Sequence, residues 1–330
     1  MSGNQKFWSK IIPSKNDSKS EKIRKTTLII SFFIFLASIL VLAWYLIAQA
    51  RVKEDIRRRQ HEYTAVTSVV TQMTTTAATE AVTEPPPPPP PLIVMERFET
   101  FLERNEHTAG WIRVPGTSIN DVVVQNEDNS FYVDHAFDGR YQKAGAIFAD
   151  YRNVVNDYNF NQSDNIILYG HNQRDGTMFG TLSRYKVKST SRSNFQFYLN
   201  NPTFTFSNLY EEYTYKIIAA FVIEVEEHQA RDGIIWDYHN YISIRRGAAP
   251  RDYASWRDNL NARTAINTGV DFNREDKFMT LSTCSNEFEP SRFVVVGRRV
   301  RDGEDPTVDT SLASINENAV EPDYNYIWSR

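Results

Sequence analysis

Cysteine is almost missing from this sequence, since Cys284 is the only one among 330 residues. A single cysteine cannot form an intramolecular disulfide. It also cannot supply the paired thiolates of zinc ribbons, iron–sulfur clusters or dithiol redox sites. Cys284 is therefore either an inert, small apolar residue or a reactive thiol, and the inert interpretation is the default without further context. The residues around it and elsewhere in the chain decide between the two.

An excess of positive charge is also missing. The chain has 37 Lys and Arg against 41 Asp and Glu, which gives a net charge of -4. Neither a fold-wide basic surface nor a nucleic-acid partner is therefore expected. The sequence has no internal repeat and no cluster with metal-ligand spacing, so no metal or other cofactor is expected. At 41% hydrophobic and 24% charged residues, the composition is that of a globular protein with one large core or two small ones.

One long hydrophobic run stands out. Leu28 to Ala48 is a stretch of 21 residues without a charge. As a helix it spans about 31 Å, the thickness of a bilayer core. Trp44 and Tyr45 lie near its outer end, where aromatic residues gather at a membrane interface. The run predicts a transmembrane helix over residues 28–48, which makes the membrane an expected partner.

A cleaved signal peptide is the alternative to an anchor, because Ala48-Gln49-Ala50 resembles a small-residue cleavage site. The apolar run is longer than the ~7–15-residue core of a signal peptide, which favours an uncleaved anchor. Seven Lys and Arg precede the run and five follow it. This bias favours a single-pass protein of the cell membrane, with a cytoplasmic N-terminus and the remainder outside the cell.

Composition divides the chain into five parts. We predict a basic cytoplasmic N-terminus over 1–27, the transmembrane helix over 28–48, a Thr- and Pro-rich extracellular linker over 49–91, a catalytic domain over 92–300 and an acidic mobile tail over 301–330. The charged residues 49–63 could extend the membrane helix by a few turns. Pro85 to Pro91 are consecutive prolines, which form a polyproline II rod of roughly 22 Å. The linker is expected to hold the folded domain away from the membrane.

Strand patterns dominate residues 92–300. Runs rich in β-branched residues predict strands at 119–125, 146–149, 165–169, 203–206, 213–225, 277–284 and 292–300. Helical spacing predicts helices at 92–102, 178–185 and 250–266. The predicted fold class is therefore mainly β, with a few helices.

Cys284 ends the predicted strand 277–284. Strand alternation places Thr280, Ser282 and Cys284 on one face, and a polar loop follows the cysteine. A thiol that shares its face with two hydroxyls is typical of an exposed nucleophile more than of a structural cysteine. Such a nucleophile needs a nearby base or cation to hold it as a thiolate, because a free cysteine has a pKa of about 8.5.

Two residues could supply that base and cation. Among the six histidines, His171 alone follows a buried-looking strand and a glycine, which places its imidazole at a sheet edge. Arg292 begins the last strand eight residues after Cys284, so a hairpin-like return would bring its guanidinium beside the thiol. Spacing alone leaves two other interpretations open: a loop histidine without a role and a solvated strand-end arginine.

In combination, these features resemble class B sortases, the membrane-anchored cysteine transpeptidases of Gram-positive bacteria. The resemblance covers about residues 108–300, and its segments occur in the family order. The segments are Trp111-Ile112, Gly116-Thr117-Ser118-Ile119, Val123-Val124-Gln125, Gly145-Ala146-Ile147-Phe148-Ala149-Asp150, Tyr169-Gly170-His171-Asn172, Asp175-Gly176-Thr177-Met178-Phe179-Gly180, Thr280-Leu281-Ser282-Thr283-Cys284, and Arg292 before an apolar terminal strand.

The resemblance implies a sortase-type eight-stranded β-barrel with peripheral helices, preceded by the transmembrane helix. It implies that Cys284 is the nucleophile, His171 the acid and base, and Arg292 the group that holds the oxyanion or positions the substrate. It also implies that substrate is bound by Ser282, Asn129 and Val133. The predicted helix at 250–266 would be the extra helix of class B. No metal is implied.

The activity implied by the resemblance is transpeptidation by a cysteine-peptidase-like enzyme. Secreted proteins with a C-terminal sorting signal would be cleaved through a thioester acyl-enzyme and joined to a peptide amine of the cell-wall peptidoglycan. Two alternatives stay open. One is a pilin-polymerising sortase that uses a lysine amine, and the other is a non-catalytic surface binding module with inert His171 and Cys284.

Overall fold

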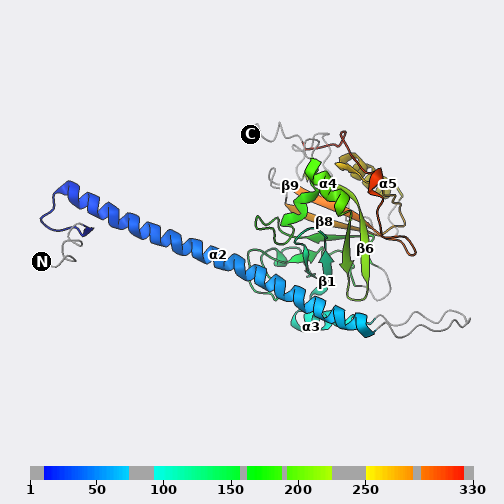
Figure 1. The fold of residues 1–330 in the computed structure, drawn as a ribbon, viewed down its shortest axis with the longest axis horizontal. Helices are drawn as coiled ribbons and strands as arrows, with labels where there is room; N and C mark the ends of the chain where they lie inside the picture. The colour runs from blue at the N-terminus through cyan, green and yellow to red at the C-terminus, as the bar shows by residue number, and fades with distance from the viewer. Residues whose placement is uncertain are drawn as a thin grey trace, which may run out of the picture. The chain divides into compact units, whose positions relative to one another are not determined.

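The computed structural model describes residues 11–73, 93–156, 162–187, 192–224, 250–284 and 291–322. The chain forms two compact units, Met1–Arg57 and Arg58–Arg330. The first unit is helical, and the second contains a β-barrel (Figure 1). The predicted polyproline rod and the polar loop after Cys284 lie outside the described residues.

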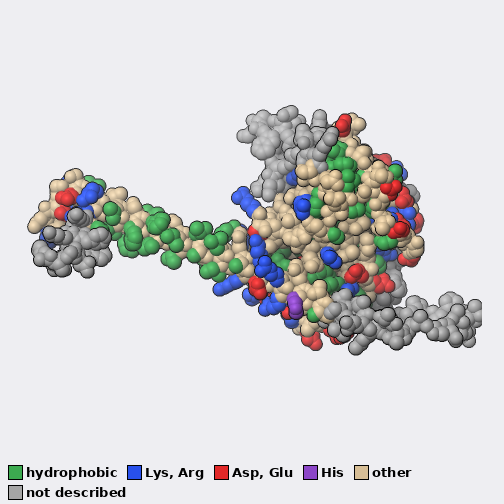
Figure 2. Space-filling model, in the orientation of Figure 1, with side chains coloured by type: hydrophobic (Ala, Val, Ile, Leu, Met, Phe, Trp, Pro, Cys, Tyr) green, Lys and Arg blue, Asp and Glu red, His purple; other side chains and the backbone are tan. Residues whose placement is uncertain are grey.

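Helix α2 (Lys19–Met73) contains the predicted membrane span and continues beyond it. Large apolar side chains along the span are exposed, from Leu28 to Ile47, and appear as the green segment of Figure 2. Within the described ranges, one helix is long and apolar enough to cross a membrane. Exposed apolar residues on every face are what a lipid environment requires, so the helix is consistent with a membrane anchor.

The second unit is built around a closed barrel of eight strands, which confirms the predicted fold class. In barrel order the strands are β1 (Thr108–Arg113), β2 (Asn120–Val124), β3 (Ile147–Ala149), β4 (Asn165–Tyr169), β8 (Phe278–Cys284), β9 (Ser291–Arg299), β6 (Glu212–Glu224) and β5 (Thr203–Ser207). Closure pairs every strand of the barrel on both sides, so the barrel sheet has no open edge.

Helices and a two-stranded sheet surround the barrel. The helices are α3 (Glu96–Arg104), α4 (Arg192–Asn200) and α5 (Pro250–Arg263), with 3-10 turns η2 (Phe131–Val133), η3 (Gly180–Tyr185) and η5 (Thr310–Leu312). Strand β7 (Ile266–Asn267) pairs with β10 (Ser314–Ile315). The predicted helix at 250–266 corresponds to α5, which ends earlier because the chain enters β7. The predicted helix at 178–185 is the shorter 3-10 turn η3.

Two strand pairings bring distant parts of the chain to one end of the barrel. Strand β4 runs parallel to β8 with Tyr169 beside Ser282, so both strands end at the same edge. Strand β9 runs antiparallel to β8, with Arg292 opposite Cys284. Every residue of β4 is buried, as expected for a continuous apolar strand inside a barrel.

Strand β1 and helix α4 are not among the predicted elements. Strand β1 carries Gly110, a residue that weakens a strand pattern. A Cβ atom at Gly110 would lie 2.2 Å from the carbonyl oxygen of Ser207, so only glycine lets β5 approach this closely. The strand depends on a contact between chain segments far apart in sequence, which periodicity does not reveal.

The end of α2 is part of the barrel unit. Arg59 forms a two-pronged ion pair with Asp121 of β2, with 2.8 Å from Nε to Oδ1 and 2.7 Å from Nη2 to Oδ2. Less than a tenth of each side chain is exposed. Tyr63 stacks on Trp111 of β1 with ring centroids 4.0 Å apart. The segment 49–91, predicted as a linker, thus begins as helix, and residues 59–63 pack on the barrel before the proline run.

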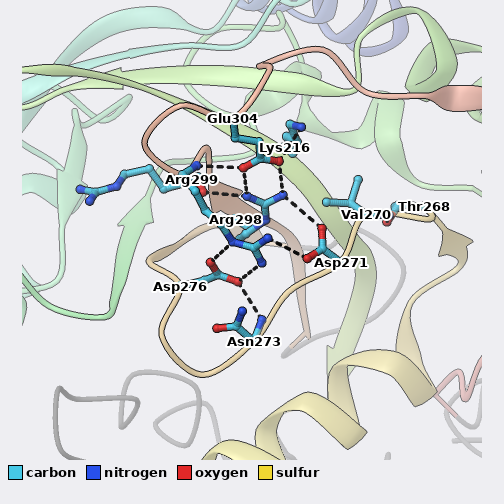
Figure 3. A network of polar contacts seen from close by, with 10 residues as sticks. Lys216, Thr268, Val270, Asp271, Asn273, Asp276, Arg298, Arg299 and Glu304 are labelled. Carbon is cyan, nitrogen blue, oxygen red and sulfur yellow. Dashed lines mark hydrogen bonds and ion pairs between the residues drawn. The ribbon is translucent and has the colours of Figure 1, made fainter.

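The predicted acidic tail, 301–330, makes contacts with the barrel in its described part. Glu304 accepts hydrogen bonds from Arg298 of β9 and from Lys216 of β6 (Figure 3). Arg301 forms ion pairs with Asp276 and Asp271. The Arg298 side chain is fully buried. A buried guanidinium requires a carboxylate partner, and the acidic segment supplies one.

Replacing Glu304 by glutamine is expected to lower the free energy of unfolding by about 2 kcal/mol near neutral pH, the usual contribution of hydrogen bonds between charged groups. The hydrogen bond from Arg298 holds the pKa of Glu304 well below its usual value. The contribution is therefore full above the unfolded pKa of about 4.3 and is lost as pH falls toward the folded pKa.

Thermal unfolding of wild type and Glu304→Gln from about pH 7 down to about pH 2 tests this linkage. The difference in Tm should be largest near neutral pH and shrink in acid. A difference that stays constant over the whole range would contradict a stabilising carboxylate at Glu304.

Candidate active site

A pocket with about 630 Å³ of empty space lies where β4, β8 and β9 meet. Its lining contains all six residues predicted for catalysis or substrate binding, together with four others. The six are Cys284, His171, Arg292, Ser282, Asn129 and Val133, and the four are Phe148, Tyr169, Gly170 and Thr283. Residues separated by more than 160 positions in sequence therefore share one cavity.

Cys284 is the last residue of β8, and it is an exposed free thiol. Ser282 lines the same pocket, whereas Thr280 instead donates a hydrogen bond to Asn165 Oδ1 inside the barrel at 3.0 Å. The hydroxyl oxygens of Ser282 and Thr283 are buried and have no hydrogen-bond partner within the part of the chain that the structure describes. Because an unpaired buried hydroxyl is costly, these two groups are suited to bind a ligand beside the thiol.

His171 lies just beyond the end of β4. Its Nε2 donates a hydrogen bond to the carbonyl oxygen of Val133 at 2.7 Å. A carbonyl can only accept, so in this ring orientation Nε2 carries a proton and Nδ1 is the ring nitrogen left for other partners. Asn172 Nδ2 donates to the carbonyl oxygen of Cys284 at 2.9 Å, which joins the histidine and cysteine segments directly.

Gly170 has a steric role in this arrangement. A Cβ atom at this position would lie 2.8 Å from the ring of Phe179. The backbone of Phe179 in turn donates to the carbonyl oxygen of His171 at 2.9 Å, so the loop after the histidine folds back against β4. Glycine between Tyr169 and His171 therefore permits the close packing that places the imidazole at the pocket.

Arg292 lies directly across the β8–β9 pair from Cys284, where the eight-residue spacing predicted it. Its partly buried guanidinium lines the pocket, and Nη1 donates to the carbonyl oxygen of Ser291 at 3.0 Å. A guanidinium provides a permanent positive charge and several donors in a planar fork. It is therefore suited to stabilise an anionic oxygen that forms near the thiol.

Asn129 and Val133 approach the pocket from the segment around η2. Asn129 Nδ2 donates to Asp150 Oδ2 at 2.9 Å, and Asn129 Oδ1 accepts from the backbone nitrogen of Tyr151 at 3.0 Å. Val133 is 39% exposed, and its carbonyl is the acceptor for His171. The two residues thus form a wall of the pocket that is joined to His171 through the Val133 carbonyl.

The sortase-domain family model matches residues 112–300, more than half of the chain. Sortase B of Staphylococcus aureus (strain NCTC 8325 / PS 47) is 30% identical over 210 residues, which are 63% of this chain and 76% of that protein. The chain belongs to the sortase family, in its class B. Members of this family are transpeptidases, and membership assigns this general activity to the chain together with the sortase B fold.

Further relatives agree with this assignment. Sortase B of Listeria monocytogenes serovar 1/2a (strain ATCC BAA-679 / EGD-e) is 27% identical over 209 residues, 63% of this chain and 75% of that protein. A solved Staphylococcus aureus sortase B–substrate complex superposes with a TM-score of 0.57 at 24% identity, covering 77% of this chain and 98% of the other. The structural match supports the barrel fold.

Four pocket residues of this sortase were not assigned as site residues from the sequence. Thr283 was placed on the opposite face by strand alternation, yet it lines the pocket at the very end of β8. Phe148, Tyr169 and Gly170 lie within the segments that carry the family resemblance, which is the signal that could have identified them. Thr283 is still paired with Phe293 of β9, so it lines the pocket from within the ladder.

No group of three or more His, Cys, Asp or Glu residues that could hold a metal ion occurs in the described ranges. The sortase pocket instead offers a thiol, an imidazole, a guanidinium and two hydroxyls. These groups are suited to nucleophilic attack on a carbonyl, proton transfer and oxyanion stabilisation.

Proposed function

We propose that the chain is a membrane-anchored cysteine transpeptidase that cleaves a C-terminal sorting signal of secreted proteins and joins them to a peptide amine of the cell wall. The observation that carries this proposal is the lining of a single pocket by Cys284, His171 and Arg292. The proposal assigns them the roles of nucleophile, acid and base, and oxyanion-binding group.

In the first half-reaction the Cys284 thiolate attacks a backbone carbonyl carbon of the sorting signal. A carbon–sulfur bond forms, and the carbonyl oxygen becomes an oxyanion that Arg292 stabilises. The scissile carbon–nitrogen bond then breaks, and His171 gives its Nδ1 proton to the leaving amine. A thioester acyl-enzyme and a neutral imidazole remain.

In the second half-reaction an acceptor amine attacks the thioester carbon. His171 Nδ1 accepts the proton that the amine loses, the carbon–sulfur bond breaks, and the thiolate is regenerated beside an imidazolium. The buried hydroxyls of Ser282 and Thr283 would hydrogen-bond the substrate backbone and so recover partners that they lack in the described part of the chain. Asn129 and Val133 would line the peptide groove.

The exposed apolar helix supports the proposed location. We assign residues 28–48 as the membrane anchor, with residues 1–27 in the cytoplasm and the barrel outside the cell, as the charge bias predicts. A domain outside the membrane can meet secreted proteins while they are still close to the cell surface.

Competition between water and amines tests the transfer reaction. With detergent-solubilised full-length chain and a panel of sorting peptides, a rising concentration of a peptide amine should convert hydrolysed product into ligated product. The physical reason is that both nucleophiles compete for one thioester. Mass spectrometry of the products measures the ratio, with Cys284→Ala as the control.

Each other outcome selects a different function. Hydrolysis alone at every amine concentration would identify a simple cysteine peptidase. Ligation only to lysine amines would identify a pilin-polymerising enzyme. Peptide binding without any cleavage would identify a non-catalytic binding module.

A further inference from the structure

We propose that Asp150, which does not line the pocket, is a positioning residue that holds the peptide-binding wall and, through it, the imidazole of His171. This proposal rests on the proposed function, because it assigns Asp150 a part in binding the sorting peptide. Asp150 follows β3 directly, and its backbone nitrogen donates to the carbonyl oxygen of Ile167 in β4 at 2.9 Å.

The Asp150 carboxylate lies behind two pocket residues. Its Oδ2 accepts hydrogen bonds from Asn129 Nδ2 at 2.9 Å and from the hydroxyl of Tyr169 at 2.8 Å. Asn129 and Tyr169 both line the pocket, and they come from opposite ends of a 40-residue stretch. One carboxylate oxygen therefore ties the segment before η2 to the end of β4.

Arg152 completes the carboxylate's partners. It donates to Oδ1 from its backbone nitrogen at 2.9 Å and from Nε at 2.8 Å, and to Oδ2 from Nη2 at 2.7 Å. The Asp150 side chain is fully buried. Burial alone would raise the pKa of Asp150, but the hydrogen bonds from Arg152, Asn129 and Tyr169 outweigh it and lower that pKa. Since every partner is a donor, only the ionised carboxylate satisfies all of them.

The link extends from Asp150 to the catalytic histidine. Asn129, held by Asp150, lies within the turn in which Asp128 accepts hydrogen bonds from the backbone nitrogens of Ser130 and Phe131. This turn leads into η2, and the carbonyl of Val133 at its end accepts the hydrogen bond from His171 Nε2. Displacement of Asn129 would therefore move the group that orients the imidazole.

A buried ion pair with a purely structural role is the competing interpretation, and the chain supplies a matched control. Asp121 is also a buried carboxylate with a two-pronged arginine partner, Arg59, at similar distances. Asp121 does not line the pocket, and neither does Arg59. Asp121→Asn should therefore reproduce the loss of stability without a change in the peptide site.

The test compares full-length Asp150→Asn, Asp121→Asn and wild type in detergent. In Asp150→Asn the amide places an NH₂ group against hydrogen-bond donors, so the pocket wall around Asn129 should shift. KM for the sorting peptide should then rise about 10-fold or more, which corresponds to the loss of one charged hydrogen bond. Alkylation of Cys284 by iodoacetamide at fixed pH should also slow, because the imidazole beside the thiol is displaced. Asp121→Asn should lower Tm and leave both readouts unchanged.

Tyr169→Phe provides a second variant that keeps the Asp150–Arg152 pair and removes one donor. Its effect on KM should not add to that of Asp150→Asn, because both changes break the same contact. If wild type converts the peptide and Asp150→Asn matches it in KM and in the alkylation of Cys284, the positioning role alone is overturned. If wild type converts none of the peptides with any of the acceptor amines, the proposed function is overturned, and the positioning role with it.

Discussion

Cys284→Ala is expected to form neither ligated product nor acyl-enzyme, with turnover on the order of 10⁴-fold or more below wild type. Losses of this size follow removal of a catalytic nucleophile, because substrate binding and oxyanion stabilisation alone retain only a small part of the rate. No other cysteine is present to replace the thiol. Chromatography of peptide products and mass spectrometry of the protein measure the two effects.

The neighbouring groups should give graded losses in the same assay. His171→Ala is expected to reduce turnover about 10²–10⁴-fold, the usual contribution of a general acid and base. Arg292→Lys keeps the charge but loses the planar fork, and about 10²-fold is expected if the guanidinium binds the oxyanion. His61→Ala, which replaces an exposed histidine of α2, is the matched control and should behave as wild type. Equal activity of His171→Ala and His61→Ala would exclude the acid and base role.

Arg59→Ala is expected to lower the free energy of unfolding by about 3–5 kcal/mol, because it leaves the buried carboxylate of Asp121 without its partner. Urea unfolding of the detergent-solubilised chain, followed by tryptophan fluorescence, measures the loss. Trp111 is a suitable reporter, since it stacks on Tyr63 one turn further along α2. Replacing both members of the pair, as Arg59→Met with Asp121→Leu, should recover most of the stability.

Arg104→Ala is the matched control for this experiment. The Arg104–Glu62 ion pair also joins the end of α2 to the barrel unit, with 2.6 Å between Nη1 and Oε2, but both side chains are about one-third exposed. Its loss should cost about 0–1 kcal/mol. If Arg59→Ala were as mild as Arg104→Ala, the end of α2 would not contribute to the folded barrel unit.

The packing of α2 has a practical consequence for the catalytic domain predicted at 92–300. A protein limited to residues 92–300 lacks Arg59 and Tyr63 on its N-terminal side and Glu304 on its C-terminal side. It would therefore leave Asp121 and Arg298, two buried charges, without the partners described above. Fragments for biochemical work should begin before residue 58 and extend through residue 322.

The segments that line the pocket were accessible from the sequence because their signals are local. The strand that ends at Cys284, the glycine before His171 and the eight-residue spacing to Arg292 are all properties of short stretches. The barrel then placed these stretches together through the parallel β4–β8 pair and the antiparallel β8–β9 pair. Thr283 was missed, since strand alternation assigned it to the face opposite Cys284, yet it lines the same pocket.

The roles of the acidic segment and of Asp150 were inaccessible for a different reason. Glu304 is one of several acidic residues in a polar stretch, and nothing local indicates that a buried arginine of β9 is its partner. Asp150 lies in a recognisable segment, but its partners Asn129 and Tyr169 are about 20 residues away on either side. Charge satisfaction in a low-dielectric interior depends on which groups the fold brings within hydrogen-bond distance.

The sequence by itself determined that the chain is mainly β, that one N-terminal stretch is apolar enough to cross a membrane, and that a lone thiol lies among the motifs of class B sortases. Composition, periodicity and spacing carry that information because they act over a few neighbouring residues. Only the tertiary structure decided that six predicted residues share one pocket, that the end of α2 and the acidic segment contact the barrel, and that Asp150 accepts hydrogen bonds from two pocket residues. These outcomes depend on strand order and on the burial of charges, which arise from contacts between residues far apart in the chain.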